Sequence, residues 1–263
     1  MSRFTTAGAG VALLATLAGA PAVHAAGLTV TVTNHAPADG VWFTPFWVGF
    51  HDGSFDVFDV GASAGSALEA LAEDGNAGPL ATAFSGAGLG GAVGAGPIAP
   101  GTSVSQVFDL ATDGSNDFLS FAAMVLPSSD FFVGNASPQA LSLSGLLDGS
   151  FTHAAWTIGV VYDAGTEVND FATSAANGLF GIAGGQSGPN EGADQFGVVT
   201  PAAGSDYLAF LNLGGADVSG LDFDNYQTLA TIEVATTPVP LPASLPLFGV
   251  ALGWLGLRRR QRG

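Results

Sequence analysis

The sequence lacks cysteine and lysine altogether, and its only strongly basic side chains are five arginines. Without cysteine the fold cannot depend on disulfides, so a large hydrophobic core must supply the stability. All five arginines lie at the ends of the 263-residue chain, at position 3 and at positions 258–262. The chain between these ends therefore has no lysine or arginine with which to form surface salt bridges.

Acidic residues, in contrast, are plentiful. All 22 of them lie between Asp39 and Glu233, so the central chain carries a formal charge of −22. Such a polyanion repels phosphate, which disfavours nucleic acid and anionic lipid headgroups as direct partners and favours cations. An alternative explanation of the same composition is solubility in salty surroundings.

The first residues have the pattern of a secretory signal peptide, which we place at Met1 to about Ala26. Arg3 provides the positive start, Ala7 to Ala20 form the apolar part, and Val23-His24-Ala25 fits the small-residue rule for cleavage. The alternative is a retained membrane helix, for which the apolar part is short.

The last residues, 236–263, have the pattern of a second targeting signal. A proline-rich lead precedes the apolar run Leu245–Leu257, and four arginines follow it. Charges in this position favour a cytoplasmic end, with the main domain outside. The three-part pattern resembles a PEP-CTERM sorting signal, here with Val-Pro-Leu-Pro at 239–242, and implies export and cleavage by an exosortase in a Gram-negative bacterium. A plain C-terminal membrane anchor is the alternative.

Between these segments, residues 28–234 have the length and the pattern of one large all-β domain. Helical spacing of leucine and alanine predicts one short helix at Ala64–Asp74, which ends at Gly75. We expect glycine-rich loops at Pro79–Gly101 and Ala175–Gly197. Strands are predicted at Leu28–Thr33, Val41–Phe50, Gly101–Leu110, Phe118–Leu126, Pro138–Leu147, Phe151–Tyr162, Tyr207–Asn212 and Gln227–Val234.

Three short motifs imitate catalytic or binding signatures. Glycines 86, 88 and 91 match the dinucleotide fingerprint, and residues 61–65 resemble a nucleophile elbow, but neither has the required strand and helix around it. We interpret His51-Asp52-Gly53 as a capped turn and not as a catalytic dyad. The acidic residues Asp222 and Asp224 form either a solvated turn or a weak second cation site.

Two stretches carry the best candidate site. In Phe121–Asn135 (FAAMVLPSSDFFVGN) a buried strand ends at a proline, and Asp130 stands on the turn before the next apolar run. Such a turn is positioned by the core, so its carboxylate is held in a fixed direction. In Tyr162–Asn169 (YDAGTEVN) a glycine turn separates Asp163 from Glu167, which allows both carboxylates to reach one ion.

The motifs PSSDFFVG and YDAGTE together resemble the spondin N-terminal domain family, known from the extracellular matrix proteins F-spondin and mindin and from bacterial proteins. The resemblance extends over Leu28–Val234. It implies an antiparallel β-sandwich related to C2 domains, with a calcium ion bound at one end. Carried over by position, the ligands are Asp130, Asp163 and Glu167. The animal spondins contain cysteines and this chain does not, so no disulfide-dependent feature is transferred.

Calcium suits three carboxylates because it is a hard cation that takes 6–8 oxygen ligands at flexible geometry. Zinc is disfavoured, since cysteine is absent and His35, His51 and His153 are scattered along the sequence. No serine, histidine and acid stand in a catalytic arrangement, so we do not expect an enzyme.

The resulting hypothesis is an exported, calcium-dependent adhesion or matrix-binding module at the bacterial cell envelope. Its expected partners are calcium, the signal peptidase and exosortase that process it, and exopolysaccharide or surface proteins. Nucleic acid is not expected. The alternatives are a calcium-dependent enzyme that acts on extracellular polysaccharide and a purely structural matrix protein.

Overall fold

The computed structural model describes residues 25–170, 174, 177–182, 184–186, 188–211, 219–224 and 226–237. The predicted signal peptide and sorting segment lie outside this part of the chain, apart from the few residues at their inner ends. Within the described residues, no helix combines the length and the apolar character needed to cross a membrane.

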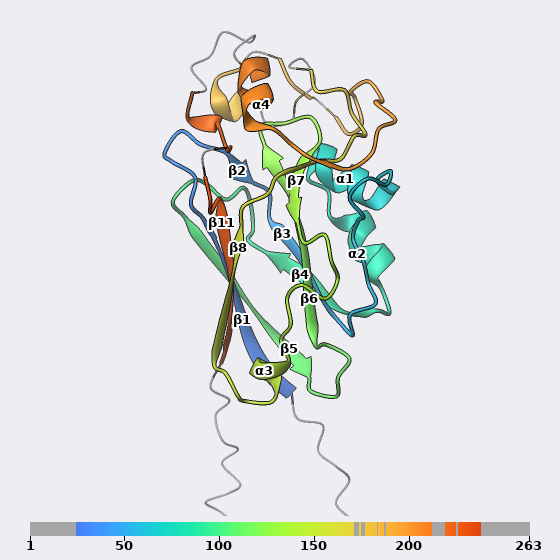
Figure 1. Ribbon diagram of the computed structural model, residues 1–263, viewed down its shortest axis with the longest axis vertical. Helices are drawn as coiled ribbons and strands as arrows, with labels where there is room; N and C mark the ends of the chain where they lie inside the picture. Colours follow the sequence, from blue (N-terminus) through green and yellow to red (C-terminus); the bar gives the residue numbers. More distant parts are fainter. Residues whose placement is uncertain are drawn as a thin grey trace, which may run out of the picture.

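Two antiparallel sheets pack face to face as a sandwich (Figure 1), which confirms the predicted all-β class. The first sheet has the order β5 (Ser103–Ala111), β1 (Ala25–Asn34), β11 (Ala230–Thr236) and β8 (His153–Ile158). The second has the order β10 (Thr200–Pro201), β9 (Tyr162–Asp163), β7 (Phe131–Gly134), β6 (Phe118–Leu126), β3 (Phe46–His51) and β4 (Gly88–Val93), with β2 (Trp42–Phe43) paired to β6.

The main core lies between the sheets and follows from strand alternation. In β1, Leu28, Val30 and Val32 are fully buried, while the threonines between them face outward. The strands β3 and β6 are buried on both faces, because helices cover the outer face of the second sheet. Phe121 of β6 therefore belongs to the main core, and its neighbour Ala122 packs in a second core under the helices.

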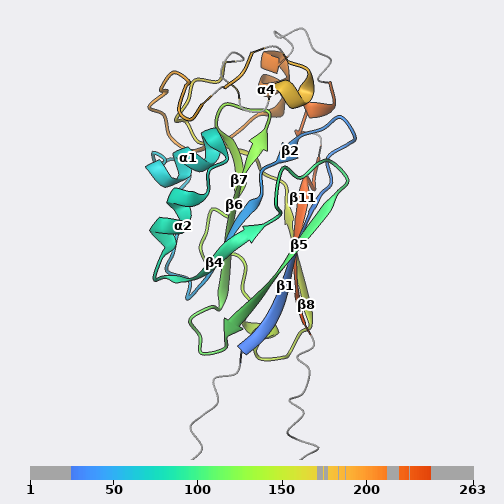
Figure 2. The same cartoon turned by 180° about the vertical axis from the view of Figure 1, so that it is seen from behind.

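The helices on this outer face are α1 (Ser66–Asp74) and α2 (Gly78–Phe84), seen from behind in Figure 2. The predicted helix is confirmed as α1, and Gly75 ends it in the left-handed conformation with φ 66°. The loop prediction at Pro79–Gly101 was wrong, since this stretch contains α2 and β4. Glycine belongs in β4 because a Cβ at Gly91 would stand 2.7 Å from the ring of Phe108.

Two strand predictions were also wrong. Tyr207–Asn212 was expected to be a strand, but Gly204–Leu211 forms helix α4. Pro138–Leu147 contains the short helix α3 (Ser144–Leu147) and only an isolated bridge between Phe118 and Ser142. Two short 3₁₀ turns, η1 (Asn177–Phe180) and η3 (Ser219–Leu221), complete the described elements.

The candidate site lies at one end of the sandwich, at the top of Figure 1. The β6–β7 turn and α4 gather there, while the two described ends of the chain lie at the other end. Leu28 pairs with Thr236 in the register of β1 and β11, which places those two ends side by side. The site is thus at the tip opposite the two described ends of the chain.

Candidate metal centre

The turn between β6 and β7 is fixed by its own side chains and by α4. Ser128 Oγ donates a hydrogen bond to the carbonyl of Val125 (2.6 Å) and accepts one from the backbone N–H of Phe131 (3.1 Å). The hydroxyl of Tyr207, on α4, donates to the carbonyl of Pro127. This turn places Asp130 fully out of contact with solvent.

The two oxygens of Asp130 have different environments. Oδ2 accepts hydrogen bonds from the N–H of Thr166 (2.8 Å), the hydroxyl of Thr166 (3.3 Å) and the N–H of Glu167 (3.2 Å). Oδ1 is buried and has no hydrogen-bond partner in the described part of the chain. A buried carboxylate oxygen without a donor is costly unless a cation or a proton faces it.

Asp163 lies next to Asp130 because Phe131 pairs with Asp163 in the register of β7 and β9. Its Oδ1 accepts from the N–H of Gly165 (2.7 Å), and its Oδ2 accepts from Nδ2 of Asn169 (2.7 Å). Each oxygen keeps a further lone pair that could face a cation.

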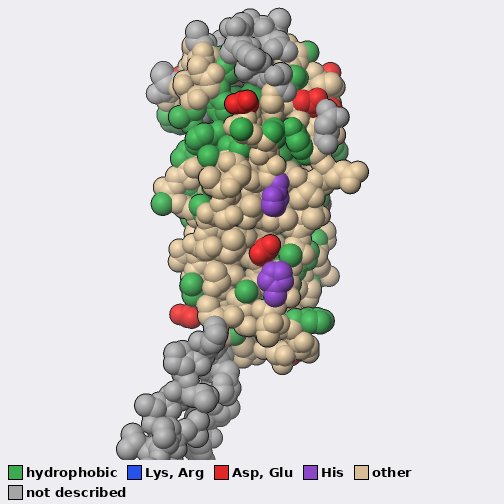
Figure 3. All heavy atoms as spheres, turned by 90° about the vertical axis from the view of Figure 1, so that its left-hand side faces the viewer, with side chains coloured by type: hydrophobic (Ala, Val, Ile, Leu, Met, Phe, Trp, Pro, Cys, Tyr) green, Lys and Arg blue, Asp and Glu red, His purple; other side chains and the backbone are tan. Residues whose placement is uncertain are grey.

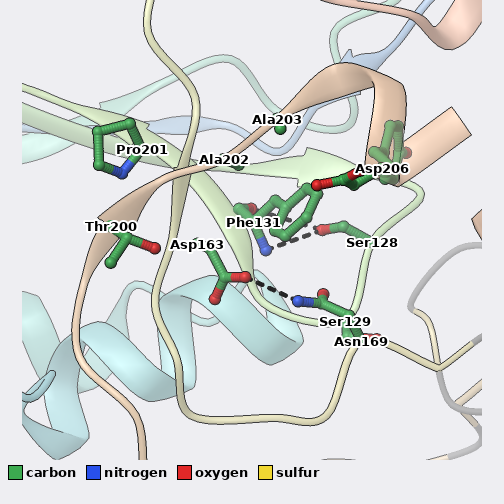
Figure 4. A pocket seen from close by; sticks show the side chains of 11 residues that line it. Ser128, Ser129, Phe131, Asp163, Asn169, Thr200, Pro201, Ala202, Ala203 and Asp206 are labelled. Atoms are coloured by element: carbon green, nitrogen blue, oxygen red, sulfur yellow. Dashed lines mark hydrogen bonds between the residues drawn. The ribbon is translucent and has the colours of Figure 1, made fainter.

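Asp163 also borders a cavity of about 380 Å³ between the β6–β7 turn and α4. Figure 4 shows its carboxylate beside Asn169, with Thr200 on one side and Asp206 of α4 on the other. The cavity thus gives the Asp163 carboxylate a route to solvent, whereas Asp130 lies behind it, out of contact with solvent.

The electrostatics of the pair require a positive partner. Burial raises the pKa of Asp130 to about 7, and the negative charge of Asp163 adds to this rise. Burial also raises the pKa of Asp163. No lysine or arginine occurs in the described residues, since all five arginines lie at position 3 and at 258–262. Only a bound cation or a proton can compensate this charge.

Glu167, the third predicted ligand, contacts Asp130 through its backbone. Its N–H is one of the donors to Asp130 Oδ2, and its side chain is buried against Gly192, where a Cβ would stand 1.9 Å from Oε1. Among the described residues no three Asp, Glu, His or Cys side chains are grouped as a ready-made metal site. The structure thus brings Asp130 and Asp163 together, and the role of the Glu167 carboxylate stays a prediction.

The donor set fits a hard cation. The two carboxylates themselves supply only oxygen ligands, and the described histidines are engaged elsewhere. His35 and His153 lie on the first sheet beside Thr231 and Glu233. Figure 3 shows the outer face of that sheet, where two histidines lie among backbone and side chains that are mostly neither hydrophobic nor charged. Calcium suits such oxygen ligands and takes up missing ones from backbone carbonyls and water.

The other sequence candidates have structural roles. His51 is buried, with Nδ1 accepting from the N–H of Gly53 and Nε2 at 2.9 Å from Ser120 Oγ, so the capped-turn interpretation is confirmed. Asp224 accepts from the N–H groups of Gly204 (2.7 Å) and Ser205 (2.9 Å), which caps α4. The acidic turn around Asp224 therefore serves the helix.

The sequence did not predict that residues of α4 line the cavity opposite Asp163. Asp206 and Tyr207 reach it from α4, a helix whose cap comes from a distant part of the chain, so no local signal indicated it. Asn169, in contrast, stands within the YDAGTEVN motif, and its position after Asp163 could have identified it.

Comparison with known families gives one match. A family model described as Spondin_N matches residues 30–177, more than half of the chain. No curated protein matches the chain. The matched segment includes Asp130, Asp163 and Glu167, and it ends within the connection between β9 and β10, before α4.

Proposed function

Since the chain belongs to the spondin N-terminal domain family, we propose that it is an exported, calcium-binding adhesion module of the bacterial cell envelope or extracellular matrix. Family membership supports an extracellular, adhesion-type module in general. Calcium binding and the bacterial envelope are the specific parts of the proposal. The motifs near the two ends of the sequence support processing by a signal peptidase and an exosortase.

One observation carries the calcium proposal. Asp130 is fully buried beside a second carboxylate, and its Oδ1 has no hydrogen-bond donor among the described residues. A cation facing this oxygen would offset the burial of the charge and the repulsion from Asp163. Asp130 and Asp163 would hold the ion directly.

A bound calcium ion supplies positive charge and oxygen-specific coordination. The chain's own contribution is to fix the two carboxylates from different elements, the β6–β7 turn and the end of β9. Since the ion binds only where both are in place, it stabilises the folded tip by linkage. Extracellular calcium modules bind at about 10⁻⁴–10⁻³ M, so occupancy would follow the surroundings.

Calorimetric titration with calcium, together with thermal melting, tests the site. We expect wild type to bind one ion at the tip and to melt at higher temperature with calcium than in EDTA. Asp130→Asn and Asp163→Asn should lose both effects, and Glu167→Gln tests the third predicted ligand. Asp148→Asn is the matched control, because Asp148 is an exposed acid that accepts from Ser150 near α3, at the end of the fold opposite the tip. Unchanged calcium responses in the Asp130 and Asp163 variants would refute the site.

The proposal includes no catalysis, and a separate measurement addresses this point. A glycan array would report binding, and chromatography of the same glycans after incubation would report cleavage. Calcium-dependent retention without cleavage products is expected. Cleavage that is lost in Asp130→Asn would instead establish the alternative, a calcium-dependent enzyme that acts on polysaccharide.

A further inference from the structure

Phe196 is exposed to an unusual degree. Its side chain is 88% exposed, whereas the next most exposed large hydrophobic residue of the described chain, Phe151, is 63% exposed. The backbone of Phe196 is also left-handed, with φ 55°, which an aromatic residue rarely adopts. An exposed aromatic side chain in an unfavourable backbone conformation points to a binding role.

The backbone on both sides of Phe196 is hydrogen-bonded to Gly165 and Thr166, in the loop that donates to Asp130. Gln195 N–H donates to the carbonyl of Thr166 (2.7 Å), and Gly197 N–H donates to the carbonyl of Gly165 (2.6 Å). Thr166 in turn donates its own N–H to Asp130 Oδ2. The ring is therefore presented from a fixed backbone, at the same tip as the carboxylate pair.

A small acidic cavity of about 240 Å³ lies directly beside the ring. Phe196 forms part of its wall, together with Thr166 and the carboxylate residues Glu69 and Asp194. Burial raises the pKa of the neighbouring Glu73, and the charges of Glu69 and Asp194 add to this rise, so each of these two acids lies within electrostatic reach of Glu73. No lysine or arginine in the described residues compensates them.

We propose that Phe196 and this acidic cavity form a docking surface for a protein segment that presents an arginine or lysine side chain beside an apolar one. The basic group would enter the cavity between Glu69 and Asp194, and it could also lie against the Phe196 ring. The apolar neighbour would cover the rest of the ring, as aromatic anchors do at the centres of interfaces.

Charge complementarity selects this partner. The acids of the cavity exclude phosphate, acidic polysaccharide and anionic lipid, and a purely apolar partner would leave both carboxylates unpaired. Phe196 and Asp194 lie beyond the segment that matches the family, residues 30–177, whereas Glu69 and Thr166 lie within it. The inference deepens the proposed adhesion function by assigning the chemistry of the partner.

Selection from a random phage-displayed peptide library on the purified protein, with calcium present, tests the surface. We expect selected peptides to carry arginine or lysine next to aromatic or aliphatic residues. Phe196→Asn removes the ring and keeps a residue that tolerates the left-handed backbone. It should weaken binding of the synthesised peptides at least about tenfold, as should replacing their basic residue by alanine. Glu69→Gln with Asp194→Asn should do the same.

Phe151→Asn is the matched control, since it removes another exposed phenylalanine, which packs against Gly145 near α3. Peptides without basic residues, equal binding to Phe196→Asn, or no enrichment over Phe196→Asn as bait would each overturn the docking surface. Calcium calorimetry separates this from the proposed function. Phe196→Asn should bind calcium as wild type does, whereas peptide binding without any calcium binding would refute the calcium site and leave the docking surface standing.

Discussion

The carboxyl group of Asp130 is buried, yet only one of its oxygens is satisfied by donors. In Asp130→Asn the amide oxygen can accept from Thr166 and Glu167, and the amide nitrogen can donate toward Asp163. Without calcium at pH 7 we expect this variant to be more stable than wild type by a few kcal/mol, since one unit of pKa corresponds to about 1.4 kcal/mol. Urea unfolding in EDTA measures this difference. A variant less stable than wild type in EDTA would contradict it.

The same carboxyl predicts a pH dependence. Its pKa is raised to about 7 in the folded state, so folding takes up a proton. The contribution of Asp130 to stability is therefore complete below the unfolded pKa of 3.8 and is lost as pH rises through about 7. In EDTA, the stability gap between Asp130→Asn and wild type should close as pH falls from 7 to 4. A gap that is constant over this range would show that Asp130 does not titrate there.

His51 contributes a pH dependence of stability with the opposite sign to that of Asp130. Burial lowers its pKa, and Nδ1 must stay unprotonated to accept from Gly53 N–H. Its contribution is present above the unfolded pKa of 6.5 and is lost as pH falls below it. His51→Leu should cost about 1–3 kcal/mol at pH 7.5, because Gly53 N–H and Ser120 lose their partner, and it should reduce the loss of stability toward pH 5.

Measurement in the Asp130→Asn background removes the competing carboxyl titration from this comparison. His35→Gln is the control, since His35 is exposed and is not part of the His153–Glu233 ion pair. If His51→Leu and its parent lose the same stability between pH 7.5 and pH 5, His51 is not the group responsible.

At the scale of elements, alternation and aromatic density were sufficient to predict β1, β3, β6 and β11, because these strands bury their side chains in a regular pattern. The same local information failed for β4, whose glycines make room for the rings of Phe84 and Phe108. Packing against Phe108 and pairing with β3, which lie outside a local window around β4, decide that strand.

In the candidate site, too, some features could be predicted from the sequence and others could not. Asp130 and Asp163 were predictable, since Asp130 directly precedes β7, Asp163 ends β9, and each lies within a family motif. Their closeness follows from the pairing of β7 and β9, which the motifs implied only through the resemblance. The orientation of Glu167 depends on its contact with Gly192, and the cavity wall from α4 depends on the cap by Asp224. The sequence around the motifs encodes neither contact.

Helix α4 depends on one distant cap. Asp224 accepts from the N–H groups of both Gly204 and Ser205, and these bonds lower its pKa. Asp224→Ala should destabilise the start of α4 by about 1 kcal/mol, while Asp224→Asn should retain most of the cap. Amide hydrogen exchange measures this, with faster exchange expected in α4 and unchanged exchange in β6. If the amides of α4 exchange equally slowly in Asp224→Ala and in Asp224→Asn, the cap is dispensable.

At the scale of the whole molecule, charge repulsion dominates the electrostatics. The described residues contain one ion pair, His153–Glu233, with a nitrogen–oxygen distance of 3.6 Å and both side chains about half exposed. Salt therefore has little attraction to weaken and much repulsion to screen. We expect the melting temperature to rise with sodium chloride up to about 0.1 M, where the Debye length is about 10 Å. This rise should be the same in wild type and in Asp130→Asn.

Calcium at equal ionic strength separates binding from screening. Screening acts on all 22 acids together, so removing one carboxylate changes it little. Binding at the tip requires Asp130 and Asp163 specifically, so calcium should stabilise wild type beyond the sodium chloride effect and Asp130→Asn no further than that effect. Magnesium should have a weaker effect than calcium, because it demands octahedral geometry and gives up water reluctantly. Equal stabilisation of both proteins by calcium would mean that the polyanion collects calcium diffusely, without a defined site.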